Sequence, residues 1–180
     1  MIETGKAGAA LKGAVFFDRD GVLNVDKGYV YRPEDFEWIP GAQKAIQLAQ
    51  DAGYYTFVVT NQSGVARGFY QEDDIHRLHQ WMNAELARSG AEITAFYHCP
   101  FHSEGSVEAY IVADHPDRKP NPGMILRAIE EWHLDPKMCV LIGDKTSDIE
   151  AASRAHVEGL LFDGSNLQTV VERWLDRQAD

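Results

Sequence analysis

The sequence predicts an α/β fold, a Rossmann-like three-layer sandwich in which a mainly parallel sheet lies between two layers of helices. Short apolar runs of strand length alternate along the chain with longer segments whose apolar residues recur at helical spacing. Helical connections between consecutive strands produce right-handed crossovers and a parallel sheet. The chain has 180 residues, enough to bury the core of one domain and too few for a second.

The expected elements follow one another without an internal repeat. Strands are predicted at residues 14–17, 54–59, 95–98, 138–142 and 157–162. Helices are predicted from the apolar stripes Ala42, Ala45, Ile46 and Ala49; Ile75, Leu78, Met82 and Leu86; and Ile125, Leu126 and Ile129. Gly53 is expected to end the first helix, and Asn121-Pro122 to provide the N-cap and first turn of the third.

One domain is expected at residues 13–180, after a flexible N-terminal tail at residues 1–12. Two stretches without periodicity, residues 21–40 and 99–118, are each about twenty residues long. Irregular segments of this length are more often functional loops than inserted domains. We therefore expect two long loops and no lid domain.

Composition excludes several classes of protein. Seventeen Lys and Arg against 28 Asp and Glu give a net charge of −11, which opposes binding to nucleic acid. No apolar run approaches the roughly 18 residues of a membrane span, so no membrane association is expected. Cys99 and Cys139 are too few for a disulfide framework. We expect a cytoplasmic protein with reduced thiols, either a monomer or a weak homo-oligomer.

Two aspartates follow the first predicted strand. Asp18 and Asp20 are two positions apart, so in extended chain both carboxylates face one side, where their repulsion favours a cation. Mg²⁺ prefers oxygen ligands and is readily shared with a phosphate, and Asp144 after the fourth strand supplies a further carboxylate. By itself the run from Asp18 to Gly21 is equally compatible with an ordinary turn.

Polar residues at other strand ends extend this pattern. Asp18-Arg19-Asp20-Gly21, Thr60-Asn61, Lys119 and Gly143-Asp144 with Asp148 resemble, in this order, the four motifs of the haloacid dehalogenase superfamily of phosphohydrolases. Together these motifs are far more specific than any one of them. The resemblance covers nearly the whole chain and implies a capless haloacid dehalogenase-like phosphatase domain.

The resemblance implies a role for each carboxylate. Asp18 would be the nucleophile that forms an aspartyl-phosphate, and Asp20 the general acid and then the general base. Asp18, Asp144 and Asp20, through its backbone carbonyl, would hold Mg²⁺, and Asp148 would orient that set of ligands.

The resemblance also assigns the polar residues around the phosphoryl group. Thr60 and Asn61 would hold phosphoryl oxygens by hydrogen bonds, and Lys119 would neutralise charge on the nucleophile and the phosphate. Thr60 and Lys119 thus join Asp18 and Asp20 as the predicted catalytic residues. Each of these residues taken alone is more often a turn former or a solvated charge.

A closer resemblance concerns the substrate. Residues 26–30, 60–68, 118–120 and 143–145 resemble the D-glycero-D-manno-heptose-1,7-bisphosphate phosphatases, which share ancestry with histidinol phosphatases. It implies a Mg²⁺-dependent hydrolase that removes the 7-phosphate of a small sugar bisphosphate. Its implied substrate-binding residues are Asp26, Lys27, Gly28, Tyr29, Thr60, Asn61, Gln62, Ser63, Arg118, Lys119 and Lys145. The alternatives are a histidinol-phosphate phosphatase and a non-catalytic binding relative of the fold.

The chain departs from that group at its zinc ligands. Members commonly hold a structural zinc with a Cys-x-His pair and a later Cys-x-Cys pair. Here Phe101 stands where the first His is expected, and residues 113–117 contain no Cys. A structural zinc is therefore not expected. A substitute set drawn from His98, Cys99, His102 and His115 is the alternative, because zinc accepts mixed sulfur and nitrogen ligands.

Overall fold

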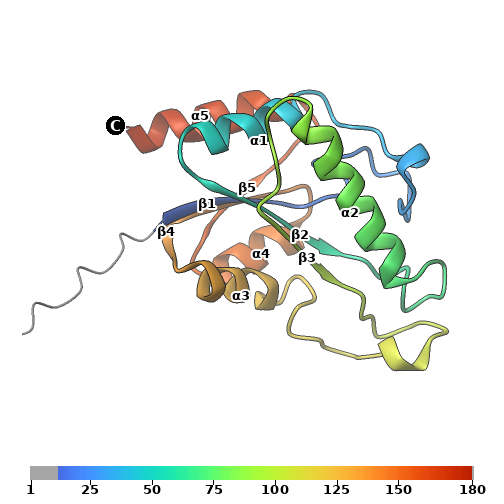
Figure 1. Ribbon diagram of the computed structural model, residues 1–180. Coiled ribbons are helices and arrows are strands. Elements are labelled where there is room, and N and C mark those ends of the chain that lie inside the picture. The colour runs from blue at the N-terminus through green and yellow to red at the C-terminus, as the bar shows by residue number, and fades with distance from the viewer. Residues whose placement is uncertain (1–11, 180) are drawn as a thin grey trace, which may run out of the picture.

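The computed structural model describes residues 12–179, which form five parallel strands flanked by helices (Figure 1). The strand order is β3-β2-β1-β4-β5, so β1 lies at the centre and β3 at one edge. The strands are β1 Lys12–Phe17, β2 Tyr55–Asn61, β3 Ala95–Cys99, β4 Leu134–Gly143 and β5 Glu158–Leu161. The helices are α1 Ala42–Asp51, α2 Glu72–Ala87, α3 Gly123–Trp132, α4 Thr146–Arg154 and α5 Leu167–Ala179. The predicted fold class is confirmed.

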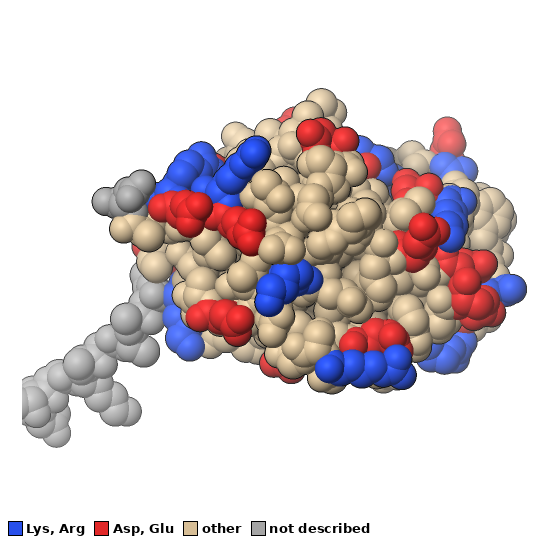
Figure 2. Space-filling model, turned by 90° about the horizontal axis from the view of Figure 1, so that it is seen from above, with Lys and Arg blue, Asp and Glu red and all other residues tan. Residues whose placement is uncertain are grey.

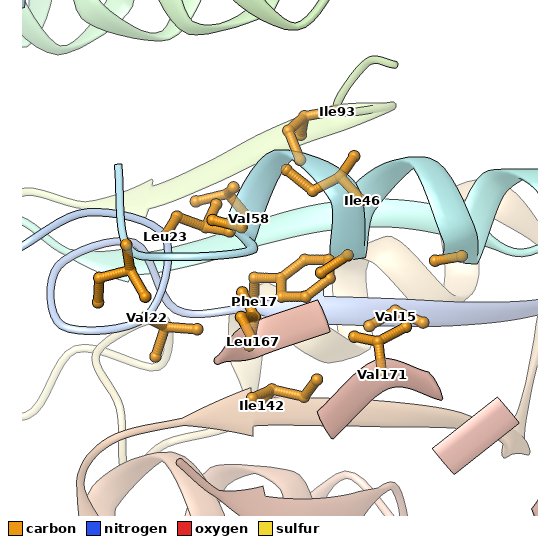
Figure 3. Close-up of a cluster of buried hydrophobic side chains, with 14 of the residues drawn as sticks. Val15, Phe17, Val22, Leu23, Ile46, Val58, Ile93, Ile142, Leu167 and Val171 are labelled. Carbon is orange, nitrogen blue, oxygen red and sulfur yellow. The ribbon is translucent and has the colours of Figure 1, made fainter. Parts of the chain in front are cut away.

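The central strand is buried on both faces, as its apolar sequence requires. On one face, Val15 and Phe17 pack with α1, α2 and α5, and Figure 3 shows them beside Leu167 and Val171 of α5. On the other face, Ala14 and Phe16 pack with α3 and α4. Alternate residues of β1 therefore enter two separate cores, and a one-residue shift of the strand would move each side chain into the opposite core.

Element boundaries differ from the predicted ones where local pairing is irregular. β4 begins at Leu134, which pairs with Lys12, but the regular register resumes only where Cys139 pairs with Ala14. This irregularity hides the start of β4 from a periodicity analysis. The apolar periodicity predicted no helix at the positions of α4 and α5, and α5 packs against α1. The predicted tail lies outside the described residues except for Lys12, the first residue of β1.

Asn121 does not act as the N-cap predicted for α3. The helix begins at Gly123, with Pro122 at the N-cap position and no capping hydrogen bond from a side chain. The Asn121 amide instead donates to Asp114 Oδ1 and accepts from Arg154 Nη1. These longer-range bonds tie the start of α3 to α4.

The two predicted loops are present. Apart from Cys99, the last residue of β3, the first loop, residues 21–40, and the second loop, residues 99–118, contain only one-turn 3₁₀ helices, Pro33–Asp35 and Glu108–Tyr110, and isolated bridges. None of the described helices is long and apolar enough to cross a membrane. Acidic and basic side chains are interspersed on the face shown in Figure 2, so the net charge of −11 is not gathered into one patch there.

Candidate active site

The site lies at the carboxyl edge of the sheet, where the predicted motifs meet. Asp18 follows β1, Thr60 and Asn61 are the last residues of β2, and Asp144 follows β4. Because β1 lies between β2 and β4, these ends are adjacent. In open α/β sheets this edge is where ligands bind.

A buried ion cluster forms the centre of the site. Lys119 Nζ lies 2.9 Å from Asp18 Oδ1 and 2.6 Å from Asp148 Oδ1, and it also donates to the carbonyl of Val59. All three charged side chains are buried. Asp148 is fixed from its other oxygen, because Oδ2 accepts the backbone N–H of Lys145 at the start of α4.

Asn61 holds Lys119 in place. Its side-chain oxygen accepts the N–H of Lys119 and its amide donates to the carbonyl of Lys119, both at 3.0 Å. The Asn61 side chain, expected from the family resemblance to hold a phosphoryl oxygen, is therefore occupied in positioning the lysine. The observed contact differs from the expected one because an amide side chain can bond to nearby backbone groups as readily as to a ligand.

Burial dominates the electrostatics of the cluster. It raises the pKa of Asp18 to about 7, an effect that Lys119 opposes and Asp148 reinforces. Burial lowers the pKa of Lys119, but its attraction to Asp18 and Asp148 outweighs this, so the pKa is raised and the lysine stays charged. Burial also raises the pKa of Asp144. Ionising both Asp18 and Asp144 is therefore unfavourable here, which favours a further cation beside them.

Asp18, Asp144 and Asp148 could hold a divalent cation. One carboxylate oxygen from each lies within 4.8 Å of the others. Asp144 Oδ1 is buried and has no hydrogen-bond partner among the described residues. Gly21, with φ of +89°, brings the backbone against this carboxylate, where an added Cβ would lie 2.3 Å from Oδ2. A compact set of hard oxygens with one unpaired atom fits Mg²⁺.

Asp20 is turned away from that cluster. Its carboxylate accepts hydrogen bonds from Asn24 at 2.9 Å, Gln62 at 2.8 Å and Arg19 at 3.0 and 3.2 Å. Burial raises the pKa of Asp20, but Arg19, Asn24 and Gln62 outweigh burial and lower it. Its side chain is therefore ionised in the ligand-free protein and separate from the three clustered carboxylates.

Tyr70 belongs to the site although the sequence analysis did not single it out. Its hydroxyl donates to Gln62 Oε1 at 2.6 Å, and Gln62 Nε2 donates to Thr60 Oγ1 at 2.8 Å. An added Cβ at Gly64 would lie 2.1 Å from the Tyr70 ring, so the glycine makes room for the tyrosine. In the sequence, Gly64 was the available signal that another group packs closely against the backbone after β2.

A cavity of about 210 Å³ opens above these groups. Its lining includes most of the predicted substrate-binding residues, namely Asp26, Gly28, Tyr29, Thr60, Asn61, Gln62, Ser63, Lys119 and Lys145, and also Tyr70 and Ser147. Two predicted residues do not line it. Lys27 pairs with Glu37 at 2.9 Å, and Arg118 donates to the carbonyl of Phe101.

An aromatic pair stands at the edge of the cavity. Tyr29 has a left-handed backbone with φ of +53° and is 45% exposed. Its ring packs edge-on against Phe69 with centroids 4.7 Å apart. Left-handed backbone is uncommon for residues with a side chain and concentrates at functional sites. The first loop thus presents an aromatic ring to whatever enters the cavity.

The substitute zinc set is not assembled. His98 Nε2 lies 2.8 Å from Glu72 Oε1, and His102 Nδ1 accepts the N–H of Glu104. Cys99 Sγ and His115 Nδ1 approach to 4.0 Å, but among the described residues no third His, Cys or carboxylate lies close enough to complete a zinc site with them. In residues 12–179, the acidic cluster is the only group of three or more such side chains close enough to share an ion.

The fold and this arrangement of carboxylates and lysine define a phosphatase of the haloacid dehalogenase (HAD)-like class. Residues 116–174 match the family model described as HAD-hydrolase-like. The D-glycero-beta-D-manno-heptose-1,7-bisphosphate 7-phosphatase of Rhodopseudomonas palustris is 46% identical over 170 residues, 94% of this chain and 93% of the relative. The D-glycero-alpha-D-manno-heptose-1,7-bisphosphate 7-phosphatase of Burkholderia mallei is 47% identical over 144 residues, 80% and 76% of the two chains.

A solved structure agrees with these relatives. The D,D-heptose 1,7-bisphosphate phosphatase of B. bronchiseptica, complexed with magnesium and phosphate, matches 93% of this chain and 99% of its own with a TM-score of 0.78 and 27% identity. The chain belongs to the family of D-glycero-D-manno-heptose-1,7-bisphosphate 7-phosphatases. This membership favours an enzyme over a non-catalytic relative of the fold.

Proposed function

We propose that this phosphatase removes the 7-phosphate of D-glycero-D-manno-heptose 1,7-bisphosphate through an aspartyl-phosphate on Asp18, with Mg²⁺ as cofactor. The observation that carries the proposal is the buried carboxylate of Asp18, in contact with Lys119 at the base of a cavity large enough for a phosphoryl group. The names of the relatives supply the substrate, and this chain's residues supply the chemistry.

The nucleophilic oxygen follows from the hydrogen bonds of Asp18. Oδ1 accepts the N–H of Arg19 at 2.8 Å and the ammonium of Lys119 at 2.9 Å. We therefore assign the attack on phosphorus to Oδ2. The new O–P bond replaces the bond to the sugar oxygen, and Lys119 neutralises charge on both reactants.

Asp20 would transfer the protons. It gives a proton to the departing sugar oxygen and then takes one from the water that hydrolyses the aspartyl-phosphate. A bound phosphate dianion raises the pKa of a neighbouring carboxyl, which opposes the effect of Arg19 on Asp20. Substrate binding therefore favours the protonated form that the first step needs.

Mg²⁺ would be held by Asp18, Asp144 and the backbone carbonyl of Asp20 and would neutralise phosphoryl charge when bound. We add Asp148 to this set of ligands, because one of its carboxylate oxygens lies within 4.8 Å of those of Asp18 and Asp144. Lys145 lies at the cavity 3.7 Å from Asp26, and its partly exposed ammonium is available to the second phosphate of a bisphosphate.

Phosphate release from both anomers of the bisphosphate, from the monophosphate and from histidinol phosphate tests the proposal. Hydrolysis of a heptose bisphosphate should have the highest kcat/KM and should stop with EDTA and in Asp18→Asn. Acid-quenched wild-type protein should carry one added phosphoryl group on the peptide that contains Asp18. Preference for histidinol phosphate would overturn the substrate, and an active Asp18→Asn protein would overturn the mechanism.

A further inference from the structure

Arg19 is a fully buried cation whose guanidinium has no positioning role in the mechanism above. It lies between the two reactive aspartates in sequence, has no exposed surface and does not line the cavity. Removing a guanidinium from water is costly unless its donors are paired. The groups that contact the guanidinium therefore show which parts of the protein Arg19 holds together.

The guanidinium connects three parts of the molecule. Nη2 donates to both carboxylate oxygens of Asp20 and to the carbonyl of Val30. Nη1 lies 3.5 Å from His79 Nε2 on α2. Burial, aided by Arg19, holds the pKa of His79 well below its usual value, so this ring is neutral and its nitrogen can accept.

Val30 follows the part of the first loop that enters the cavity. Gly28 and Tyr29 line the cavity directly before it, and both have left-handed backbone. Glycine adopts this conformation freely, but for Tyr29 it is unfavourable and persists only when the surroundings hold it. The bond from Arg19 to the Val30 carbonyl is a buried restraint at the end of that segment.

We propose that Arg19 is a positioning residue that holds Asp20 and the segment of residues 26–30 in a fixed relation, so that the proton donor meets the leaving oxygen of a bound sugar phosphate. This rests on the proposed role of Asp20. A flat guanidinium suits the task because its donors lie in one plane at fixed angles, whereas a lysine ammonium is a single flexible point. His79 steadies the guanidinium from the other side.

Leaving-group dependence distinguishes positioning from a merely structural role. A sugar alkoxide needs a proton as it departs, whereas p-nitrophenolate departs readily without one. Loss of the proton donor therefore slows sugar phosphate cleavage far more than aryl phosphate cleavage, and general acid catalysis is worth about 10²-fold or more. Loss of stability or of phosphate binding slows both substrates alike.

The experiment measures single-turnover release of sugar and of p-nitrophenol by the Mg²⁺-loaded full chain. Arg19→Met should slow sugar release about 10²-fold and p-nitrophenol release less than about 5-fold, and Arg19→Lys should not restore the ratio. Thr56→Val is the matched control. It removes a buried hydrogen bond to the carbonyl of Glu92 at the far end of β2 and should leave the ratio unchanged.

His79→Leu keeps the test valid if Arg19→Met does not fold. Removing the acceptor for Nη1 should shift the ratio in the same direction by about 5-fold, the effect of one hydrogen bond of ~1 kcal/mol. Equal slowing of both substrates in the folded variants, or no slowing, overturns the inference.

Asp20→Asn separates this inference from the proposed function. If Asp20→Asn shows the leaving-group dependence and Arg19→Met does not, the positioning role fails while the role of Asp20 stands. If Asp20→Asn also slows both substrates equally, the assignment of Asp20 fails, and the inference fails with it.

Discussion

The two long loops have the same length and very different relations to the site. The first loop, residues 21–40, gives Asp26, Gly28 and Tyr29 to the cavity. The second loop, residues 99–118, gives it none among the described residues. Instead the second loop packs on itself, with the rings of Phe101 and His115 stacked at 4.0 Å, and against the segment after β2, where Ser106 donates to the carbonyl of Arg67.

The sheet order explains the difference. The first loop leaves β1, the central strand that carries Asp18, whereas the second leaves β3 at the edge. A loop after the central strand passes over the nucleophile, but one after an edge strand reaches the site only by crossing the end of β2. The second loop does so at its end, where Lys119 follows it directly. Loop length alone therefore does not identify a functional loop.

The largest expected effect is at Lys119, the point where the second loop reaches the site. Lys119→Met should lower kcat by about 10²–10³-fold, because it removes a buried charge that faces the developing phosphoryl charge. Lys137→Met, on the surface near the start of β4, is the control and should keep full activity. Circular dichroism must show both variants folded. A folded Lys119→Met protein with wild-type kcat would place the second loop wholly outside the chemistry.

Opposite pH dependences are the next largest expected effect. Burial raises the pKa of Asp18 to about 7, so its contribution to stability is complete below its usual value of 3.8 and is lost as the pH rises through 7. Burial lowers the pKa of His98, where the second loop begins, even though Glu72 raises it. The contribution of His98 is therefore complete above its usual value of 6.5 and is lost as the pH falls.

Urea unfolding in EDTA at pH 5.5 and 7.5 measures both contributions. From pH 5.5 to pH 7.5 the free energy of unfolding of Asp18→Asn should rise by about 2 kcal/mol relative to that of the wild type. The wild type loses the contribution of Asp18 over roughly 1.5 pH units of this range, whereas the variant has no such contribution to lose. Over the same rise in pH the free energy of unfolding of His98→Gln should fall relative to that of the wild type. Parallel curves for all three proteins would mean that neither buried group titrates differently on folding.

The two loops also show how much of the structure can be predicted from the sequence. The alternation of strands and helices predicted the sheet, and the motifs predicted residues at its carboxyl edge, because three of the four follow a strand in sequence and the fourth, Lys119, precedes a helix. The contacts of Asn61 with Lys119, of Tyr70 with Gln62 and of Arg19 with Val30 were not predictable. They depend on how irregular segments fold against one another, and no periodic pattern in the sequence shows which donor meets which acceptor.

Tyr29 is the residue through which the first loop should affect substrate binding. Tyr29→Ala should raise KM for the bisphosphate about 10-fold with little change in kcat, since a ligand covering part of the ring gains roughly 1–2 kcal/mol from apolar burial. Alanine keeps the backbone constraint at this left-handed position, so the change tests the ring itself. Steady-state kinetics decide it, and a fall in kcat at constant KM would assign the loop to the chemical step instead.

The second loop should affect stability alone, through the smallest change. Tyr110→Phe removes one hydrogen bond, from its hydroxyl to Glu72 Oε2 at 2.8 Å, while His98 still pairs with Oε1 of that carboxylate. We expect a loss of about 1 kcal/mol in the free energy of unfolding, a fall of roughly 2–4 °C in Tm. Because neither Tyr110 nor Glu72 lines the cavity, kcat/KM should stay within about twofold of wild type. A larger change in kcat/KM than in stability would show that the second loop acts on the site through more than Lys119.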